Sequence, residues 1–211
     1  MTSPERPADE LANLLTHAFG FALSLAAAGH LMATAASASV PVMVACGLYS
    51  VSLIAVYGAS TLSHLFYDLA WRRWFRTLDQ ACIYLLITGT YTPLAVIYLN
   101  HGWWPVLLVL MWICALAGVV RVIRVRDLSA ADKFSYGILG LMPAVSLLEF
   151  SQSGPMSEVL WMIVGGACYL VGTIFLGLSS RVRYAHAVWH LLVIAGSGCH
   201  YWTIVMAVRP R

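Results

Sequence analysis

Long apolar segments dominate the chain. Residues 11–67, 80–120, 159–180 and 184–208 contain no Asp, Glu, Lys or Arg. About 20 apolar residues cross the hydrocarbon core of a bilayer as a helix. Polar or helix-breaking clusters at 37–41 and 100–105 divide the two longest segments. The pattern predicts seven transmembrane helices near residues 14–36, 42–66, 79–99, 105–123, 134–150, 158–178 and 185–207, of which the fifth is short and interrupted by Pro143.

Composition supports a membrane protein. The chain is 61% hydrophobic and 10% charged, whereas soluble domains contain about 25% charged residues. These values exclude a water-soluble globule and a disordered chain. The formal net charge of +3 is scattered, which argues against a nucleic-acid partner. The five cysteines stand singly in apolar segments, so neither a disulfide framework nor a thiolate metal site is expected.

Loop charges predict the orientation. Basic residues follow the second, fourth and sixth predicted helices, and none follows the first, third or fifth. Together with Arg6, ten of the 12 basic residues fall on one side, and Arg209 and Arg211 fall on the other. The positive-inside rule makes the amino terminus cytoplasmic and the carboxyl terminus external. The first ten residues lack a basic n-region, so the first apolar segment is expected to be a span rather than a removed signal peptide. The expected organisation is a cytoplasmic segment 1–12, a seven-helix domain 13–208 and a tail 209–211.

Polar side chains within the predicted spans suggest a site, because such groups are costly in a bilayer. Ser60 and His64 lie one helical turn apart, and so do His186 and His190. The topology places both pairs and Asp79 at a similar depth on the cytoplasmic side. Three imidazoles and a water form the ligand set of catalytic zinc. Asp79 could then orient a ligand or accept a proton, and Ser60 could hold the water or a substrate oxygen. The alternative is that the histidines are hydrogen-bonded packing residues.

Other polar residues fall into two groups. Glu10, Asn13 and His17 share one face of the first helix at the cytoplasmic end, so they either brace the site or form an ordinary helix start. The second group is expected to take no part in the site: His30, His101 and His200 pack or contact water, and Glu149 and Glu158, which flank the loop between the fifth and sixth predicted helices, are solvated.

Four motifs resemble those of the bacterial hemolysin III proteins, in the progestin and adipoQ receptor superfamily. They lie at Glu10 to Gly20, at Ser60 to His64, at Leu78-Asp79 with Ile87 to Pro93, and at His186 to His190 followed by His200-Tyr201. Many hemolysin III sequences carry a further histidine immediately after the Asp, where this chain has Gln80.

The resemblance implies a seven-helix, receptor-like protein of a bacterial-type plasma membrane. It implies Zn²⁺ held by His64, His186 and His190, with Ser60 and Asp79 beside it. The superfamily's similarity to alkaline ceramidases suggests zinc-dependent cleavage of a lipid amide or ester, in which Asp79 accepts a proton and Ser60 stabilises the oxyanion. One alternative is a non-catalytic sensor of a membrane lipid or fatty acyl ligand with a structural zinc. Another is a membrane-permeabilising protein. The small-residue faces at Gly165-Gly166 and Gly172 to Gly177 suit either packing within one chain or a homo-oligomer.

Overall fold

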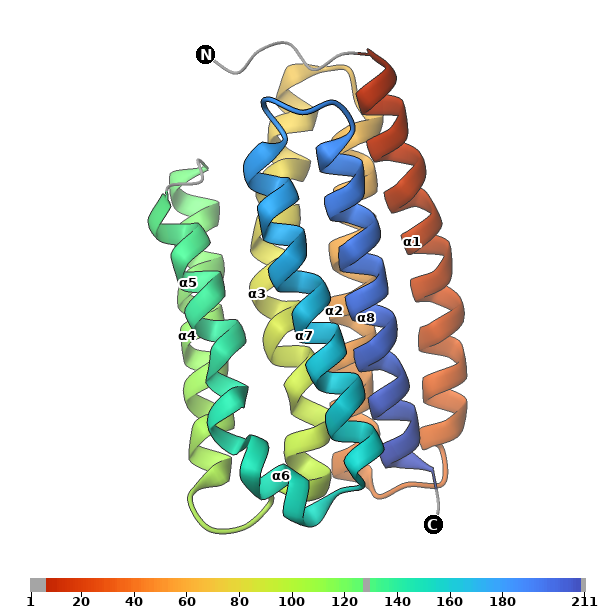
Figure 1. The fold of residues 1–211 in the computed structure, drawn as a ribbon, viewed down its shortest axis with the longest axis vertical. Coiled ribbons are helices and arrows are strands. Elements are labelled where there is room, and N and C mark those ends of the chain that lie inside the picture. Colours follow the sequence, from red (N-terminus) through yellow and green to blue (C-terminus); the bar gives the residue numbers. More distant parts are fainter. Residues whose placement is uncertain (1–6, 127–129, 210–211) are drawn as a thin grey trace.

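The computed structural model describes residues 7–126 and 130–209, and these form an elongated bundle of helices (Figure 1). The part of the chain described contains no strand. Its elements are α1 (Pro7–Ala35), α2 (Val40–Leu65), α3 (Leu69–Tyr98), α4 (Trp104–Val125), α5 (Ala130–Leu141), the 3₁₀ turn η1 (Met142–Ser146), α6 (Leu147–Ser153), α7 (Met156–Leu178) and α8 (Ala185–Val208).

Within the described ranges, seven helical segments are long and apolar enough to cross a membrane. Six are single helices, and the segment Phe134–Ser153 combines most of α5 with η1 and α6. The predicted all-α fold with seven membrane-crossing helices is confirmed. Pro143 lies in the 3₁₀ turn that interrupts the fifth crossing, since proline removes a backbone donor and disrupts the α-helical ladder.

Two helices begin earlier than the hydrophobic pattern predicts. α1 begins at Pro7, where proline suits a helix start and Asp9 and Glu10 complement the positive end of the helix dipole. α3 begins at Leu69 rather than near residue 79, because the Asp68 side chain accepts hydrogen bonds from the backbone N–H groups of Ala70 and Trp71. The arginines expected in a loop before the third helix therefore lie on its first turns: Arg72, Arg73 and Arg76.

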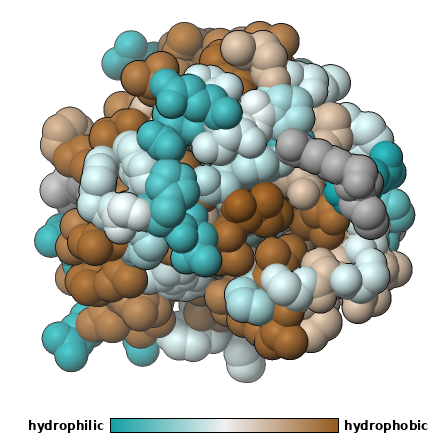
Figure 2. Space-filling model, turned by 90° about the horizontal axis from the view of Figure 1, so that it is seen from below, coloured by the Kyte–Doolittle hydropathy of each residue, from teal (hydrophilic) through white to brown (hydrophobic). Residues whose placement is uncertain are grey.

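The bundle has a central helix and a lipid-facing surface. α3 is the most buried of the crossing helices and packs against α2 and α4, while α7 packs against α8 and α1 against α2. The outer helices expose large apolar side chains such as Ile113 on α4 and Leu170 on α7. Viewed from the end that carries α6, the molecule shows hydrophobic side chains around much of its rim (Figure 2). This exposed apolar surface suits hydrocarbon as solvent.

Glycines bring α7 and α8 together. A Cβ on Gly165 would meet the His200 ring and would lie 3.0 Å from the carbonyl oxygen of Gly196, and one on Gly172 would meet the Trp189 ring. A Cβ on Gly166 or Gly177 would meet nothing within 4 Å. Gly165 and Gly172 therefore serve packing within one chain. Of the two uses that the small-residue pattern allowed, packing within the chain and contact between chains, the structure shows the first at these two positions.

The two ends of the bundle differ in charge. α1 begins at one end of the bundle and α8 finishes at the other (Figure 1). The first turns of α3, the last turns of α4 and the α7–α8 connection carry arginines and lie at the α1-start end, whereas Arg209 lies at the other. The structure does not describe three members of the charge pattern: the residues Arg6 and Arg211, and the side chain of Lys133.

Candidate metal centre

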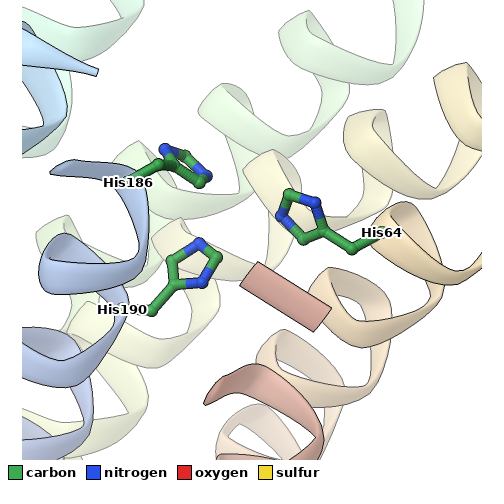
Figure 3. Close-up of side chains that lie close together, drawn as sticks. All are labelled: His64, His186 and His190. Carbon is green, nitrogen blue, oxygen red and sulfur yellow. The ribbon is translucent and has the colours of Figure 1, made fainter. Parts of the chain in front are cut away.

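Three histidines from two helices meet at the end of the bundle where α1 begins. His64 lies on the last turn of α2, and His186 and His190 lie on the first two turns of α8. One ring nitrogen from each lies within 4.8 Å of the other two. Figure 3 shows the three rings facing a common point between the two helices. The structure thus brings together the three imidazoles that the sequence selected.

This cluster is largely shielded from solvent. The His64 side chain is 3% exposed, His190 is buried, and His186 is half-buried. Tyr184 precedes α8 with a φ of 60°, a left-handed conformation that is uncommon for residues other than glycine. This turn directs the chain into α8, so that His186 comes within its first turn.

Hydrogen bonds indicate which ring nitrogens can bind a metal. His64 Nδ1 lies 2.7 Å from Glu10 Oε2, and a carboxylate can only accept, so Nδ1 carries the proton. His190 Nδ1 lies 3.1 Å from Thr16 Oγ1. The Thr16 hydroxyl already donates to the carbonyl oxygens of Ala12 and Asn13, each at 2.9 Å, so it accepts from His190. Both rings therefore keep Nε2 as a lone-pair donor, in the arrangement that orients zinc-binding histidines.

Charged partners hold the Glu10 carboxylate in place. Arg72, on the first turn of α3, forms an ion pair with Glu10. One residue earlier, Asp9 forms an ion pair at 3.4 Å with Arg183 in the α7–α8 connection. The start of α1 is thus tied to α3 and to the segment before α8. The Arg72 ion pair places the Glu10 carboxylate where it can fix the His64 ring.

Asp79 and Ser60 lie beside the histidines. Ser60 is buried one turn before His64 on α2. The Asp79 carboxylate, on the third turn of α3, forms a side-chain hydrogen bond with Ser60 and interacts electrostatically with His64 and Arg76. Because α3 starts ten residues before the predicted position, Asp79 lies inside a helix rather than at its start. A carboxylate and a hydroxyl therefore border the imidazole cluster.

The α1 residues proposed to brace the site also lie next to it. Glu10 contacts His64 directly, and the Asn13 backbone is a hydrogen-bond partner of His190. The ring centroids of His17 and His190 are 3.6 Å apart. The sequence reasoning missed Thr16 and Arg72. Thr16 could have been found from its spacing, because it lies three residues after Asn13 on the same helix. Arg72 gave no such indication, because hydropathy places it in a loop.

Polar residues at the opposite end take no part in this cluster. His30 Nδ1 lies 2.6 Å from the Tyr201 hydroxyl, and His200 Nε2 lies 3.1 Å from the carbonyl oxygen of Met162, in keeping with the packing roles expected for both. His101 forms an ion pair at 3.5 Å with Glu149.

The expectation that Glu158 is solvated is wrong. Glu158 is 2% exposed, and its carboxylate accepts a hydrogen bond of 2.7 Å from the Tyr98 hydroxyl. A buried carboxylate needs such partners, and Tyr98 provides one because α3 extends to that end of the bundle.

The donor set fits zinc. Imidazole nitrogens are preferred zinc ligands at about 2.0–2.1 Å, which puts tetrahedral ligands about 3.3 Å apart. The three nitrogens here lie within 4.8 Å of one another, so modest inward movement of the rings would complete such a site. Three protein ligands leave a fourth position, and the Asp79 carboxylate lies close enough to His64 to interact with it electrostatically.

Comparisons with known proteins agree with the motifs. The family model described as "Haemolysin-III related" matches residues 6–201. The chain is 33% identical to Hemolysin-3 of Bacillus cereus over 206 residues, covering 96% of this chain and 93% of that protein. It is also 33% identical to the Hemolysin-3 homolog of Bacillus subtilis, covering 93% of each chain.

More distant relatives come from animals. The Drosophila melanogaster adiponectin receptor protein is 26% identical over 185 residues, which cover 74% of this chain and 40% of that protein. No solved structure matches the chain. The family match over most of the chain and these relatives show that this protein belongs to the haemolysin III family of the progestin and adipoQ receptor superfamily.

Proposed function

We propose that this protein binds zinc through His64, His186 and His190 and hydrolyses an acyl amide or ester bond of a membrane lipid. The observation that carries the proposal is the convergence of three ring nitrogens within 4.8 Å of one another, beside a hydrogen-bonded Asp79 and Ser60. Hydrolytic zinc sites combine three protein ligands, an open position and a nearby proton acceptor.

The chain's own groups divide the chemistry between them. Zinc bound by three imidazoles supplies a Lewis acid and activates water near neutral pH. The Asp79 carboxylate accepts the proton of the attacking water, and the neighbouring Arg76 supports its charge. Once Asp79 has taken that proton, it no longer needs the hydrogen bond from Ser60, and the Ser60 hydroxyl can turn to donate to the acyl oxygen, where negative charge develops. Glu10 and Thr16 keep the His64 and His190 rings oriented.

The proposed location is the cytoplasmic side of a bacterial plasma membrane. The arginines on α3, α4 and the α7–α8 connection lie at the same end of the bundle as the histidines. Basic residues concentrate on the cytoplasmic side of membrane proteins. The hydrolysed lipid would then come from the inner leaflet.

Metal analysis of the purified full chain tests the site before any substrate is chosen. We expect about one zinc ion per wild-type chain, as three-histidine sites bind, and little zinc in His190→Ala. His30→Ala is the matched control, because His30 lies at the opposite end of the bundle and bonds to Tyr201. Equal zinc content in wild type and His190→Ala would refute the site.

Turnover of acyl amides and esters tests the reaction. Asp79→Ala should reduce the rate by about 10²–10⁴-fold, the typical contribution of general acid–base catalysis, while zinc content is retained. Asp9→Asn, which alters a carboxylate paired with Arg183, should not change it. Full turnover by Asp79→Ala would show that Asp79 is not the base. Lipid-dependent stabilisation without product would favour a sensor, and liposome leakage that persists after chelation would favour permeabilisation.

A further inference from the structure

Two buried side chains next to the histidine cluster carry polar atoms that find no hydrogen-bond partner in the part of the chain that the structure describes. Asn13 is 2% exposed and His17 is 5% exposed. Asn13 Oδ1 and both ring nitrogens of His17 have no partner among the described residues. Leaving such buried atoms unpaired is unfavourable, and native structures rarely do so. These atoms lie one turn apart on one face of α1, and the His17 ring packs on that of His190.

A groove on the membrane-facing surface begins close to His17. It has a volume of about 360 Å³ and lies between α1, α2 and α8. At its inner end Gly20 and Tyr57 line it, and the centroids of the Tyr57 and His17 rings are 5.4 Å apart. At its outer end it reaches Ala27 and Tyr201. We call it the α1–α8 groove.

The polar side chains along the groove already have hydrogen-bond partners within the protein. Ser24 donates to the carbonyl oxygen of Phe21 at 2.7 Å. Tyr57 donates to Ser197 at 2.9 Å, and Tyr201 is bonded to His30. The unpaired atoms lie beyond the inner end, at Asn13 and His17. A molecule that suits both regions is apolar along the groove and polar at the inner end.

We infer that the α1–α8 groove holds the hydrocarbon chain of a membrane lipid, and that Asn13 and His17 bind the polar group of this lipid. Lipid is the occupant because the groove opens on the apolar surface of membrane-crossing helices, beside exposed side chains such as Leu23. Its polar group carries an N–H or O–H, because Asn13 Oδ1 can only accept a hydrogen bond. The neutral His17 ring both donates and accepts.

This geometry also gives the lipid a direction. Its polar group lies against His17, which packs on His190, so it is presented to the histidine cluster. The inference rests on the proposed function only in one respect, namely that the bound lipid is then hydrolysed at the histidine cluster. Binding to the groove and to the polar pair can be measured without turnover.

The probes are a matched amide and ester: N-methylpalmitamide and methyl palmitate, each with a photoreactive diazirine near the end of its chain. Both are presented to the full-length protein in nanodiscs. We expect the amide to bind wild type about tenfold more tightly, the effect of about 1.4 kcal/mol, because only the amide can donate to Asn13 Oδ1. Asn13→Leu should remove the preference. The photolabel should lie on peptides that contain residues 20–27 and 194–201.

Two glycines provide a matched pair that leaves the polar residues intact. A Cβ on Gly198, in the groove, and a Cβ on Gly166, on α7, would each meet nothing within 4 Å. A side chain can thus begin at both positions without a clash at its Cβ. Gly198→Leu should weaken binding of both probes at least tenfold, and Gly166→Leu should leave binding unchanged.

Equal binding of amide and ester to wild type would overturn the assignment of Asn13. Equal behaviour of Gly198→Leu and Gly166→Leu would overturn that of the groove. Both outcomes are independent of catalysis: a protein that prefers the amide but never forms product supports this inference and refutes the proposed hydrolysis. A protein that hydrolyses the lipid while Gly198→Leu binds both probes as tightly as wild type supports the proposed hydrolysis and refutes this inference.

Discussion

The Glu10 carboxylate on the first turn of α1 lies 2.7 Å from His64 Nδ1 on the last turn of α2. Two residues far apart in the sequence are thereby coupled at the end of the bundle, and Arg72 of α3 joins them through its ion pair with Glu10. The contact gives these two charged side chains a role at the ends of otherwise apolar helices, because together they fix the orientation of the His64 imidazole. Removal of either partner should therefore affect metal binding.

Glu10→Gln should weaken zinc binding about 10–100-fold, the usual effect of altering a residue that orients a metal-binding histidine. The substitution preserves shape but removes the charge that holds the His64 ring and pairs with Arg72. Affinity is measured by competition with a chromophoric chelator. Asp9→Asn serves as the control, because Asp9 pairs with Arg183 instead. An unchanged affinity in Glu10→Gln would separate Glu10 from the metal.

Thr16→Val should also lower zinc affinity, by about tenfold or more, because it removes the oxygen that accepts from His190 Nδ1. Thr61→Val is the matched control, since the Thr61 hydroxyl bonds only within its own helix, to the carbonyl oxygen of Tyr57. Chelator competition compares the two variants. If Thr16→Val and Thr61→Val lose zinc affinity equally, the loss is a general effect of replacing a threonine within a membrane helix and does not come from the bond to His190.

Tyr98→Phe should destabilise the protein by about 1–3 kcal/mol, because it removes a hydrogen bond to the buried Glu158 carboxylate. Zinc content should not change, since Tyr98 is 19 residues beyond Asp79 on α3, about 28 Å at 1.5 Å per residue. Thermal unfolding in detergent provides the measurement. Tyr67→Phe, at a side chain that is 98% exposed, should leave the unfolding temperature unchanged. A loss of zinc in Tyr98→Phe would contradict the separation of the two ends.

Gly165→Leu should destabilise the contact between α7 and α8 by about 1–3 kcal/mol or more, the cost of overpacking a close interface. A side chain there would collide with the His200 ring and with the Gly196 backbone. Gly166→Leu, one residue later and facing open space, should be neutral. Thermal unfolding of the two variants compares them directly. Similar unfolding temperatures would show that the two helices can separate without loss of stability.

The seven crossings could be predicted from sequence because each requires a long uncharged apolar segment, and the bilayer sets that length. The helix ends were less predictable. Asp68 and the arginines after it look like a loop by hydropathy, yet Asp68 caps a helix that carries those arginines. Local hydrogen bonding, which hydropathy does not register, decided where α3 begins.

The histidine cluster could be selected from sequence because i, i+4 spacing and a common depth restrict which side chains can meet. The ring orientations could not. They depend on Thr16 and Glu10 reaching from α1 across to α8 and α2, and spacing along one helix does not specify contacts between helices. For the same reason Glu158 looked solvated, since its partner Tyr98 lies 60 residues earlier in the chain.

Two of the three histidines lie on α8, the last helix of the chain, and the third lies on α2. During synthesis the early helices reach the membrane with His64 alone, and the cluster cannot assemble until the final crossing has been inserted. An ion bound by the three histidines would cross-link α2 to α8 only after the last helix has been inserted. A product truncated before α8 would lack both this cross-link and the site.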